Sequence, residues 1–409
     1  MESVKGSQRL AALRVLGRVL SERVPLAVSL NDLLEGQSGW VHEVVAGTLR
    51  WRGRLDWIID QFALKKRPTG AIRKCLEMAI YQLLNQPQVE PAWIVSETVD
   101  LVRAREGQAA SQFVNALLRK VSADLSSWRD LRFPENDLAA QARWASLPDW
   151  MWKRIVWDLG QERARDFALR SLERPVTWVR ARSAVERAEP GPLPESWRLL
   201  EWWPVQESQE YQAGRLFVQD LSSQQLIHDF CAVVGQKGRL LDLCAAPGGK
   251  SAGLAWMGWQ VTATDRVEGD ARYRLLLETA SRIESEHPLV VLPRKQAIEA
   301  GPYDAVWVDA PCTGSGVVRR HPEIRWLKDE KDLFSLQKLQ RELVSEALTC
   351  VRPGGWFMYT VCSVLRDELL AAQEGARVAG LELIREWVLF GDGDGFSGLL
   401  FRKPAGLRE

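Results

Sequence analysis

Two cysteines stand shortly after predicted β-strands, each on a loop of polar or small residues. Cys312 follows Asp309 by three residues, beyond the apolar stretch 304–308, and Cys362 follows the stretch 356–360. A single free cysteine is usually a small buried packing residue. Because a parallel sheet binds ligands at the carboxyl ends of its strands, two thiols and an acid at such ends predict a reactive site.

A turn of small residues between a predicted strand and a predicted helix is the second feature. The strand 239–243 runs into Cys244, Ala245, Ala246, Pro247, Gly248, Gly249 and Lys250. Small side chains let backbone N–H groups and a helix N-terminus approach a ligand closely. The turn lacks the spacing of a dinucleotide fingerprint or a P-loop. Asp265 ends the next predicted strand, where an acid can bind ribose hydroxyls, so the pair predicts a site for a nucleoside cofactor.

Two thiols beside a nucleoside cofactor suit the methylation of carbon-5 of cytosine. This carbon is a poor nucleophile until a thiolate adds to carbon-6 and converts the ring into an enamine, which can attack a sulfonium methyl group. An acid at the base edge, here Asp309, withdraws the negative charge that develops on the ring. The residues alone do not decide whether Cys312 or Cys362 is the nucleophile.

Composition sets only broad limits on partners and location. The chain has 409 residues, a formal net charge of +1, and 46% hydrophobic against 26% charged residues, which is typical of a globular protein. No stretch resembles a signal peptide or a membrane span, so we expect a cytoplasmic protein that does not bind membranes. The six cysteines lack metal-type spacing, so we expect reduced thiols and no metal.

The periodicity of apolar residues predicts a helical front and an α/β back. From 8 to 121 the apolar residues recur at helical spacing, and 122–137 is polar like a linker. Beyond 217, short apolar stretches at 239–243, 260–264, 289–292, 304–308 and 356–360 alternate with helical segments, the rhythm of a parallel sheet. We therefore predict an all-helical domain at 1–140, a small α+β module at 141–216 and a Rossmann-like domain at 217–409.

These motifs together resemble the Sun family of RNA 5-methylcytosine methyltransferases, most closely its RsmB type. The resemblance rests on 242–250, Asp309-Ala310-Pro311-Cys312, Arg319-Arg320-His321-Pro322 and Thr360-Val361-Cys362-Ser363. In the front part, Gly47-Thr48-Leu49-Arg50, Tyr81-Gln82-Leu83-Leu84 and 114–119 are similar to the NusB-like domain fused to that type. The resemblance thus covers nearly the whole chain.

The resemblance implies roles that spacing does not give. Cys362 is the expected nucleophile, Cys312 is expected to assist product release, and S-adenosylmethionine is the expected methyl donor. The cofactor is expected to contact Cys244 through Lys250, Asp265 and Asp309. The expected partner is ribosomal RNA, bound by a monomer, and the clusters Arg50-Trp51-Arg52 and Lys65-Lys66-Arg67 are predicted to position it.

The sequence also departs from the family pattern. Arg294-Lys295-Gln296-Ala297 stands where a Gly-Asp pair usually meets the adenine, Thr360-Val361 replaces Ala-Thr, and Leu369 replaces an Asn. One alternative is therefore a catalytically weak RNA-binding or ribosome-assembly factor on the same fold. Another is a methyltransferase for DNA or a small molecule, although a small-molecule enzyme needs neither the helical front nor paired thiols.

Overall fold

The computed structural model describes residues 4–33, 39–63, 67–201 and 203–405. The chain divides into two compact units. Unit 1 comprises Met1–Arg174 and Val318–Glu330, and unit 2 comprises Pro175–Val317 and Lys331–Glu409. Of the segment 141–216, residues up to 174 therefore lie in unit 1 and the others in unit 2. Among the described helices, none is long and apolar enough to cross a membrane.

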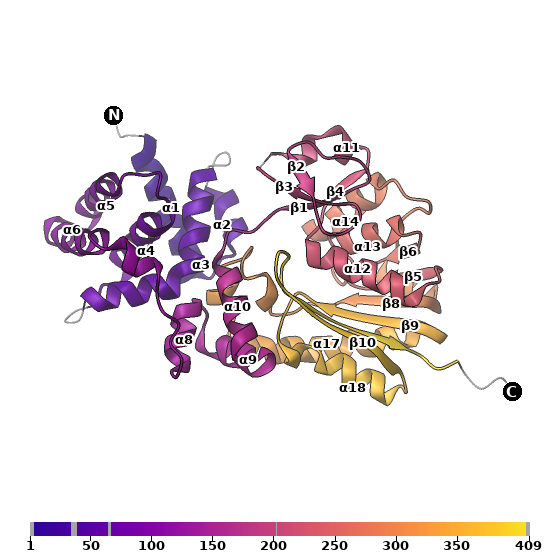
Figure 1. The fold of residues 1–409 in the computed structure, drawn as a ribbon. Helices are drawn as coiled ribbons and strands as arrows, with labels where there is room; N and C mark the ends of the chain where they lie inside the picture. Colours follow the sequence, from indigo (N-terminus) through magenta and orange to yellow (C-terminus); the bar gives the residue numbers. More distant parts are fainter. Residues whose placement is uncertain (1–3, 34–38, 64–66, 202, 406–409) are drawn as a thin grey trace. The chain divides into compact units, whose positions relative to one another are not determined.

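Unit 1 is helical, as the apolar periodicity predicts (Figure 1). Leu13, Leu16 and Val19 are buried on one face of the first helix, and Leu76 to Leu84 supply much of the fourth. The predicted linker at 122–137 contains a short helix, α7. The helices are α1 Val4–Glu22, α2 Leu26–Leu33, α3 Gly39–Phe62, α4 Gly70–Asn85, α5 Pro91–Glu106, α6 Gln108–Ser122, α7 Leu125–Arg129, α8 Leu138–Ala145, α9 Asp149–Leu159 and α10 Gln161–Leu172.

Helices α3 and α4 approach each other closely where Gly47 faces Tyr81. A Cβ atom on Gly47 would lie 1.9 Å from the Tyr81 ring, so only glycine fits there. The Tyr81 hydroxyl donates a 2.7 Å hydrogen bond to Glu43 on the same helix as Gly47. The glycine therefore serves helix packing.

A segment that follows the Cys312 loop, Val318–Glu330, is built into unit 1. Arg325, in the short helix α16 Ile324–Leu327, is fully buried. Its guanidinium donates to the carbonyls of Ala145 at 3.1 Å, Ser146 at 2.9 Å and Ser171 at 2.6 Å. The Trp326 indole N–H donates to the Leu49 carbonyl at 2.7 Å. These contacts tie distant parts of the sequence into one helical body.

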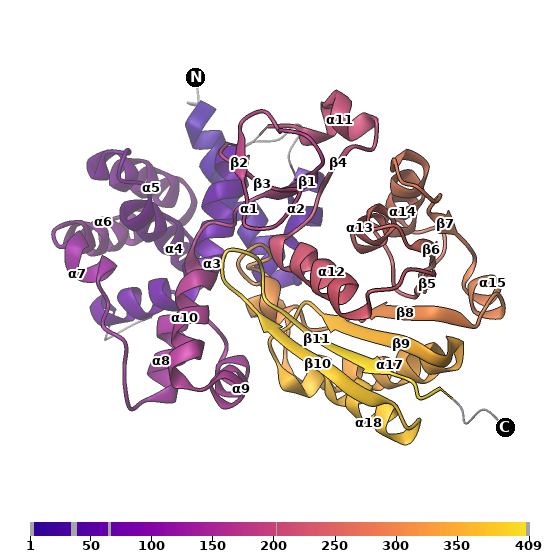
Figure 2. The ribbon, with the colours of Figure 1, turned by 45° about the vertical axis from the view of Figure 1, so that its right-hand side comes forward.

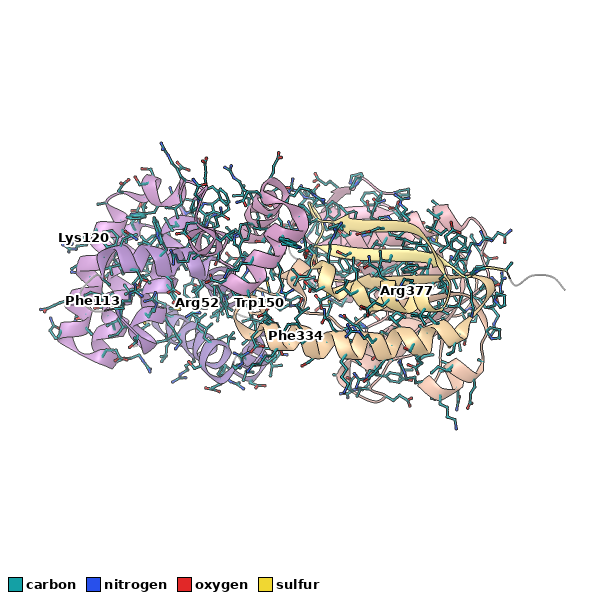
Figure 3. All side chains as sticks on the ribbon, turned by 90° about the horizontal axis from the view of Figure 1, so that it is seen from below. Arg52, Phe113, Lys120, Trp150, Phe334 and Arg377 are labelled. Atoms are coloured by element: carbon teal, nitrogen blue, oxygen red, sulfur yellow. The ribbon has the colours of Figure 1, made fainter. Side chains whose placement is uncertain are left out.

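Of the cluster Arg50-Trp51-Arg52, predicted to position RNA, Arg50 is buried within this unit, whereas Trp51 and Arg52 are half-buried. Arg50 is 3% exposed and donates to the Arg319 carbonyl at 3.0 Å. Arg52, labelled in Figure 3, stacks over Trp326 at 5.1 Å and lies 3.4 Å from Glu77. Arg50 and Arg52 are therefore both engaged in contacts within unit 1, with a carbonyl, an indole and a carboxylate.

The other basic runs have different environments. Lys65 and Lys66 lie outside the described residues. Arg67 is exposed and lies 3.6 Å from Asp60. Arg319, predicted beside the reactive loop, is only 5% exposed and belongs to unit 1.

Unit 2 contains a seven-stranded sheet in the order β10-β11-β9-β8-β5-β6-β7. The five strands from β5 to β9 pair in parallel, and β11 and β10 add antiparallel strands at one edge. The strands are β5 Arg239–Asp242, β6 Gln260–Ala263, β7 Val290–Val291, β8 Tyr303–Asp309, β9 Val351–Val361, β10 Glu382–Leu389 and β11 Phe396–Arg402. The predicted Rossmann-like sheet is confirmed, whereas the β10–β11 hairpin was not predicted.

Helices cover both faces of this sheet (Figure 2). Side chains alternate along β8, so that Ala305 and Trp307 pack on one face and Val306 and Val308 on the other. Helices α12 Leu221–Val234, α13 Gly249–Trp256 and α14 Ala271–Arg282 cover the Trp307 face. Helices α15 Arg294–Glu299, α17 Glu330–Cys350 and α18 Leu370–Val378 cover the other face.

The order in which strands are added to the sheet switches sides between β5 and β8, which are parallel neighbours. Strands β6 and β7 extend from β5 on one side, and β8 and β9 extend on the other. Such a switch point is where ligands bind in open α/β sheets. The loops after β5, β8 and β9 therefore share one edge.

A second, antiparallel sheet precedes the large one in unit 2. Its strands are β1 Trp178–Ala181, β2 Ala188–Pro190, β3 Ser196–Leu199 and β4 Leu216–Val218, in the order β2-β3-β1-β4. Arg180 of β1 is fully buried and pairs with Glu195 at 2.9 Å. Its guanidinium also donates to the Gly253 carbonyl of α13 at 3.4 Å. The small sheet therefore packs on a helix that covers the seven-stranded sheet.

Replacing Arg325 should destabilise unit 1. Arg325→Ala leaves three buried carbonyls without their charged donor, and the expected loss of unfolding free energy is about 3 kcal/mol. Arg325→Lys should recover only part of it, because an ammonium cannot reproduce the planar fork. Chemical denaturation followed by tryptophan fluorescence measures the loss. Arg377→Ala, at an exposed position of α18 labelled in Figure 3, is the control; equal stability of the Arg325→Ala and control proteins would contradict the assignment.

The buried acid at the end of β5 should make stability depend on pH. Burial raises the pKa of Asp242 to about 7, against about 3.9 in an unfolded chain. The folded state therefore retains a proton that the unfolded state releases, and this group lowers stability as pH rises from about 4 to 7. Asp242→Asn should gain stability relative to the native protein across that window, on the order of 2 kcal/mol. Denaturation at pH 4.5 and pH 7.5 tests this; a constant difference between the two proteins would refute it.

Candidate active site

The two predicted thiols meet at the ends of β8 and β9. These strands pair in parallel with Asp309 opposite Thr360, so the loops that follow begin side by side. The Sγ atoms of Cys312 and Cys362 lie 3.1 Å apart. Gly316 N–H donates to the Cys362 carbonyl at 3.1 Å, and the hydroxyls of Ser315 and Ser363 lie 2.8 Å apart. The two loops are thus joined both before and after the thiols.

The two thiols have different environments. The hydrogen bond with Cys362, together with burial, raises the pKa of Cys312 well above its ordinary value. Cys312 therefore keeps its proton and is suited to donate to Cys362. The 3.1 Å separation places the protonated Cys312 within hydrogen-bond reach of the Cys362 sulfur.

Asp309 is held from two sides. Its Oδ2 pairs with Lys250 Nζ at 2.7 Å, and its Oδ1 accepts a hydrogen bond from the Thr360 hydroxyl at 2.9 Å. The Thr360 oxygen in turn accepts from the buried Trp307 indole N–H at 3.0 Å. Burial lowers the pKa of Lys250, but the negative charge of Asp309 and the hydrogen bond between the two side chains outweigh that effect, so the pKa of Lys250 is raised overall. Lys250 is therefore a cation next to Asp309.

The small-residue turn after β5 is folded tightly onto the end of β6. Ala245 N–H donates to the Thr264 carbonyl at 3.0 Å, and Gly248 N–H donates to the Ala245 carbonyl at 2.7 Å. Gly248 has a φ of +105°, which L side chains rarely adopt. A Cβ on Gly249 would meet no atom within 4 Å, so the start of α13 is open there. An open helix start bordered by backbone amides suits an adenosyl cofactor with a carboxylate tail.

Asp265, the predicted ribose-binding acid, lies beside this turn. Its Oδ2 accepts from Ala246 N–H at 2.9 Å and its Oδ1 from Arg266 N–H at 2.7 Å. A carboxylate has about four acceptor positions, so these two bonds orient it and leave capacity for hydroxyl donors. Burial raises the pKa of Cys244 far above its ordinary value, so this thiol packs under the turn and remains protonated.

Arg294, which stands in place of the usual acid, has a structural role. Its guanidinium pairs with Glu346 and donates to the Leu243 carbonyl at 3.0 Å. Its backbone N–H donates to Glu268 Oε1 at 3.0 Å, which places a carboxylate at the end of β7. Arg294 thereby joins β5 to α17.

Sequence reasoning missed several side chains around the thiols. Thr360 was noted only as a departure from a pattern, yet it orients Asp309. Glu368 is fully buried and accepts from the backbone and hydroxyl of Thr313, next to Cys312. Gln340 of α17 donates to the Pro311 carbonyl at 2.9 Å. Glu368 follows Arg366 and Asp367 directly, so the sequence held no signal that singled it out from its charged neighbours.

Comparison with known proteins identifies relatives over most of this chain. Residues 230–376 match the family described as 16S rRNA methyltransferase RsmB/F, and residues 7–123 match the NusB family. A putative methyltransferase of Mycobacterium tuberculosis is 34% identical over 379 residues, which cover 85% of this chain and 80% of that protein. The ribosomal RNA small subunit methyltransferase B of Xylella fastidiosa is 30% identical over 386 residues, which cover 88% of this chain and 86% of that protein.

Among solved structures, the fold recurs over almost the full length. The crystal structure of PH0851 matches 98% of this chain and 99% of that one, with a TM-score of 0.69 and 21% identity. Identity at that level shows the fold, and the sequence relatives show the family. The chain therefore belongs to the RsmB/F family of S-adenosylmethionine-dependent methyltransferases and carries a NusB-family domain at its front.

Proposed function

We propose that this protein methylates carbon-5 of a cytosine in RNA through a covalent cysteine–cytosine intermediate. The observation that carries the proposal is the pair of thiols 3.1 Å apart, beside the Lys250–Asp309 ion pair. Small-molecule and DNA methyltransferases do not need this combination together with a NusB-like domain. The names of the relatives support ribosomal RNA of the small subunit as the substrate.

Cys362 supplies the nucleophile in this proposal. Its thiolate forms a bond to carbon-6, and the electron pair of the 5,6 double bond moves into the ring. Asp309, oriented by Lys250 and Thr360, binds the polar edge of the base and stabilises that charge. The enamine then takes a methyl group at carbon-5, which S-adenosylmethionine supplies when bound at the turn after β5 and at Asp265.

Release of the product needs a second group. Carbon-5 must lose its proton, and the carbon–sulfur bond to Cys362 must break to restore the aromatic ring. While both thiols are free, Cys312 is protonated because it bonds to Cys362. Once Cys362 is a thioether, that bond no longer opposes ionisation of Cys312. After Cys312 has released its own thiol proton to solvent, its thiolate accepts the carbon-5 proton. The electron pair of that C–H bond re-forms the 5,6 double bond, and the Cys362 sulfur leaves carbon-6 as a thiolate.

The alternative is an RNA-binding assembly factor with little catalytic activity. The replacement of the usual adenine-side acid by Arg294 is the observation that favours it. Transfer of tritium from labelled S-adenosylmethionine to ribosomal RNA separates the two proposals, because an assembly factor would bind the RNA without labelling it.

The two thiols should give opposite phenotypes. Cys362→Ala cannot form the enamine, so we expect neither methyl transfer nor a covalent protein–RNA adduct. In Cys312→Ala, Cys362 can still add to carbon-6, but the carbon–sulfur bond breaks slowly. A covalent protein–RNA complex should therefore accumulate and survive denaturing electrophoresis. Both variants are incubated with substrate RNA and S-adenosylmethionine and run on one gel.

The same gel contains the outcomes that would overturn the proposal. A trapped band on Cys362→Ala and none on Cys312→Ala would exchange the two roles. Two variants that lose a little stability and form no adduct would indicate packed structural cysteines.

The helical unit is proposed to hold the RNA backbone through a cationic cavity on α1, α4 and α5. The cavity has a volume of about 410 Å³ and is lined by Arg14, Lys74 and Arg105, among others. Arg18 beside them pairs with Asp32 at 2.8 Å. In the described ranges, no carboxylate lies within ion-pair distance of Arg14, Lys74 or Arg105. The Glu22 carboxylate also lines the cavity, but cations predominate in the lining, which suits binding of phosphates.

Reversing these charges should weaken RNA binding and its salt dependence. For the triple variant Arg14→Glu, Lys74→Glu and Arg105→Glu, we expect the slope of log K against log salt to fall by about 0.7 to 0.9 per lost phosphate contact. Affinity for S-adenosylmethionine should stay unchanged. Lys120→Glu, exposed on α6 and labelled in Figure 3, is the matched control. An unaltered slope in the triple variant would refute the assignment.

A further inference from the structure

We infer that Glu368 is a positioning residue for Cys312, holding the loop that carries this thiol within reach of Cys362. The inference rests on the proposed function and deepens it, because it assigns a residue to the release step. Glu368 ends the short 3-10 helix Arg366–Glu368, shortly after the Cys362 loop. It is far from the cofactor turn in sequence and is fully buried.

Both carboxylate oxygens of Glu368 bind the residue that follows Cys312. Oε1 accepts from the Thr313 backbone N–H at 2.8 Å, and Oε2 accepts from the Thr313 hydroxyl at 2.6 Å. This two-point contact fixes the position and the rotation of Thr313. The backbone next to the thiol therefore cannot swing without breaking two hydrogen bonds to an acid.

Gln340 holds Pro311, the residue before Cys312, through one hydrogen bond. Its side-chain N–H donates to the Pro311 carbonyl at 2.9 Å and to Glu368 Oε1 at 3.3 Å. Gln340 is fully buried on α17. Cys312 is thus bracketed by two residues, and a single buried pair, Glu368 and Gln340, holds both.

Glu368 is itself anchored to the strand that leads to Cys362. The Tyr359 hydroxyl, from β9, donates to the Glu368 backbone carbonyl at 3.0 Å. Glu368 therefore links β9 to the Cys312 loop through a continuous set of hydrogen bonds. This connection explains how the two thiols hold a 3.1 Å separation although they lie on different loops.

A carboxylate in the core loses hydration free energy on folding, which destabilises the folded state. Burial raises the pKa of Glu368, and its hydrogen bonds to Ser363, Thr313 and Gln340 oppose that rise. A well-packed apolar residue of similar size is often at least as stabilising as a buried charge. The acid is better explained by a geometric requirement, which an apolar side chain cannot meet.

The test uses the full-length protein with substrate RNA and S-adenosylmethionine, with turnover and covalent adduct measured together. Glu368→Met keeps the volume and removes both acceptors. We expect its turnover to fall about 10-fold to 100-fold, as for a displaced catalytic group. We also expect a trapped protein–RNA band like that of Cys312→Ala, because Cys362 still attacks. Glu368→Gln keeps one acceptor and a donor for the Thr313 hydroxyl, so it should recover most of the turnover and lose the band.

A purely structural role makes a different prediction. Turnover and adduct would then fall together with the folded fraction, and no band would accumulate on Glu368→Met, which would overturn the inference. Thr313→Val keeps the backbone contact to Glu368 and removes only the hydroxyl, which donates to Glu368 and accepts from the Ser315 N–H at 3.4 Å. It is the milder variant if Glu368→Met fails to fold; it should show a weaker band, and the absence of that band would equally count against the inference. If Cys312→Ala itself shows no band, the assignment of Cys312 to product release fails, and the inference about Glu368 fails with it; if neither cysteine variant shows a band, the proposed covalent function fails independently of Glu368.

Discussion

The parallel pairing of β8 with β9 is the constraint on which the reactive part of unit 2 depends. The ladder places Asp309 opposite Thr360, so the two strands end together and their loops begin together. Side chains alternate between the two faces of a strand, and a shift of one residue would move Asp309 and Thr360 to opposite faces. The contact between Thr360 and Asp309 and the approach of Cys312 to Cys362 follow from this register, whereas the contact of Lys250 with Asp309 depends on the pairing of β5 with β8.

Charged side chains are concentrated around that pairing, and each has a defined partner. Asp309 is shared between Lys250 and Thr360, and Glu368 is shared between Thr313 and Gln340. An isolated buried charge would cost several kcal/mol, so these groups are arranged as small networks. The networks orient the thiols more rigidly than packing of sulfur against apolar atoms would, since hydrogen bonds specify direction as well as distance.

The helical unit is completed by a segment from far along the chain. Val318–Glu330 comes directly after the Cys312 loop in sequence and supplies Arg325 and Trp326 to unit 1. Removing the front of the chain would therefore expose a buried arginine and leave its segment without partners. For this reason, charge reversal on the surface is a cleaner way to examine RNA binding than truncation, and the front domain cannot be regarded as a simple appendage.

The sequence by itself determined the five parallel strands of the large sheet, the cofactor turn and the two thiol loops, because these depend on local periodicity and on small residues at strand ends; it did not predict the β10–β11 hairpin. It indicated that Cys312 and Cys362 converge, since carboxyl ends of parallel strands share an edge. It did not reveal that Arg50 is buried, that Arg319 belongs to the helical unit, or that Glu368 and Gln340 bracket Cys312. Whether a charged residue faces solvent or a buried carbonyl depends on contacts between residues far apart in the sequence, 269 positions for Arg50 and Arg319, and only the tertiary structure decides such contacts.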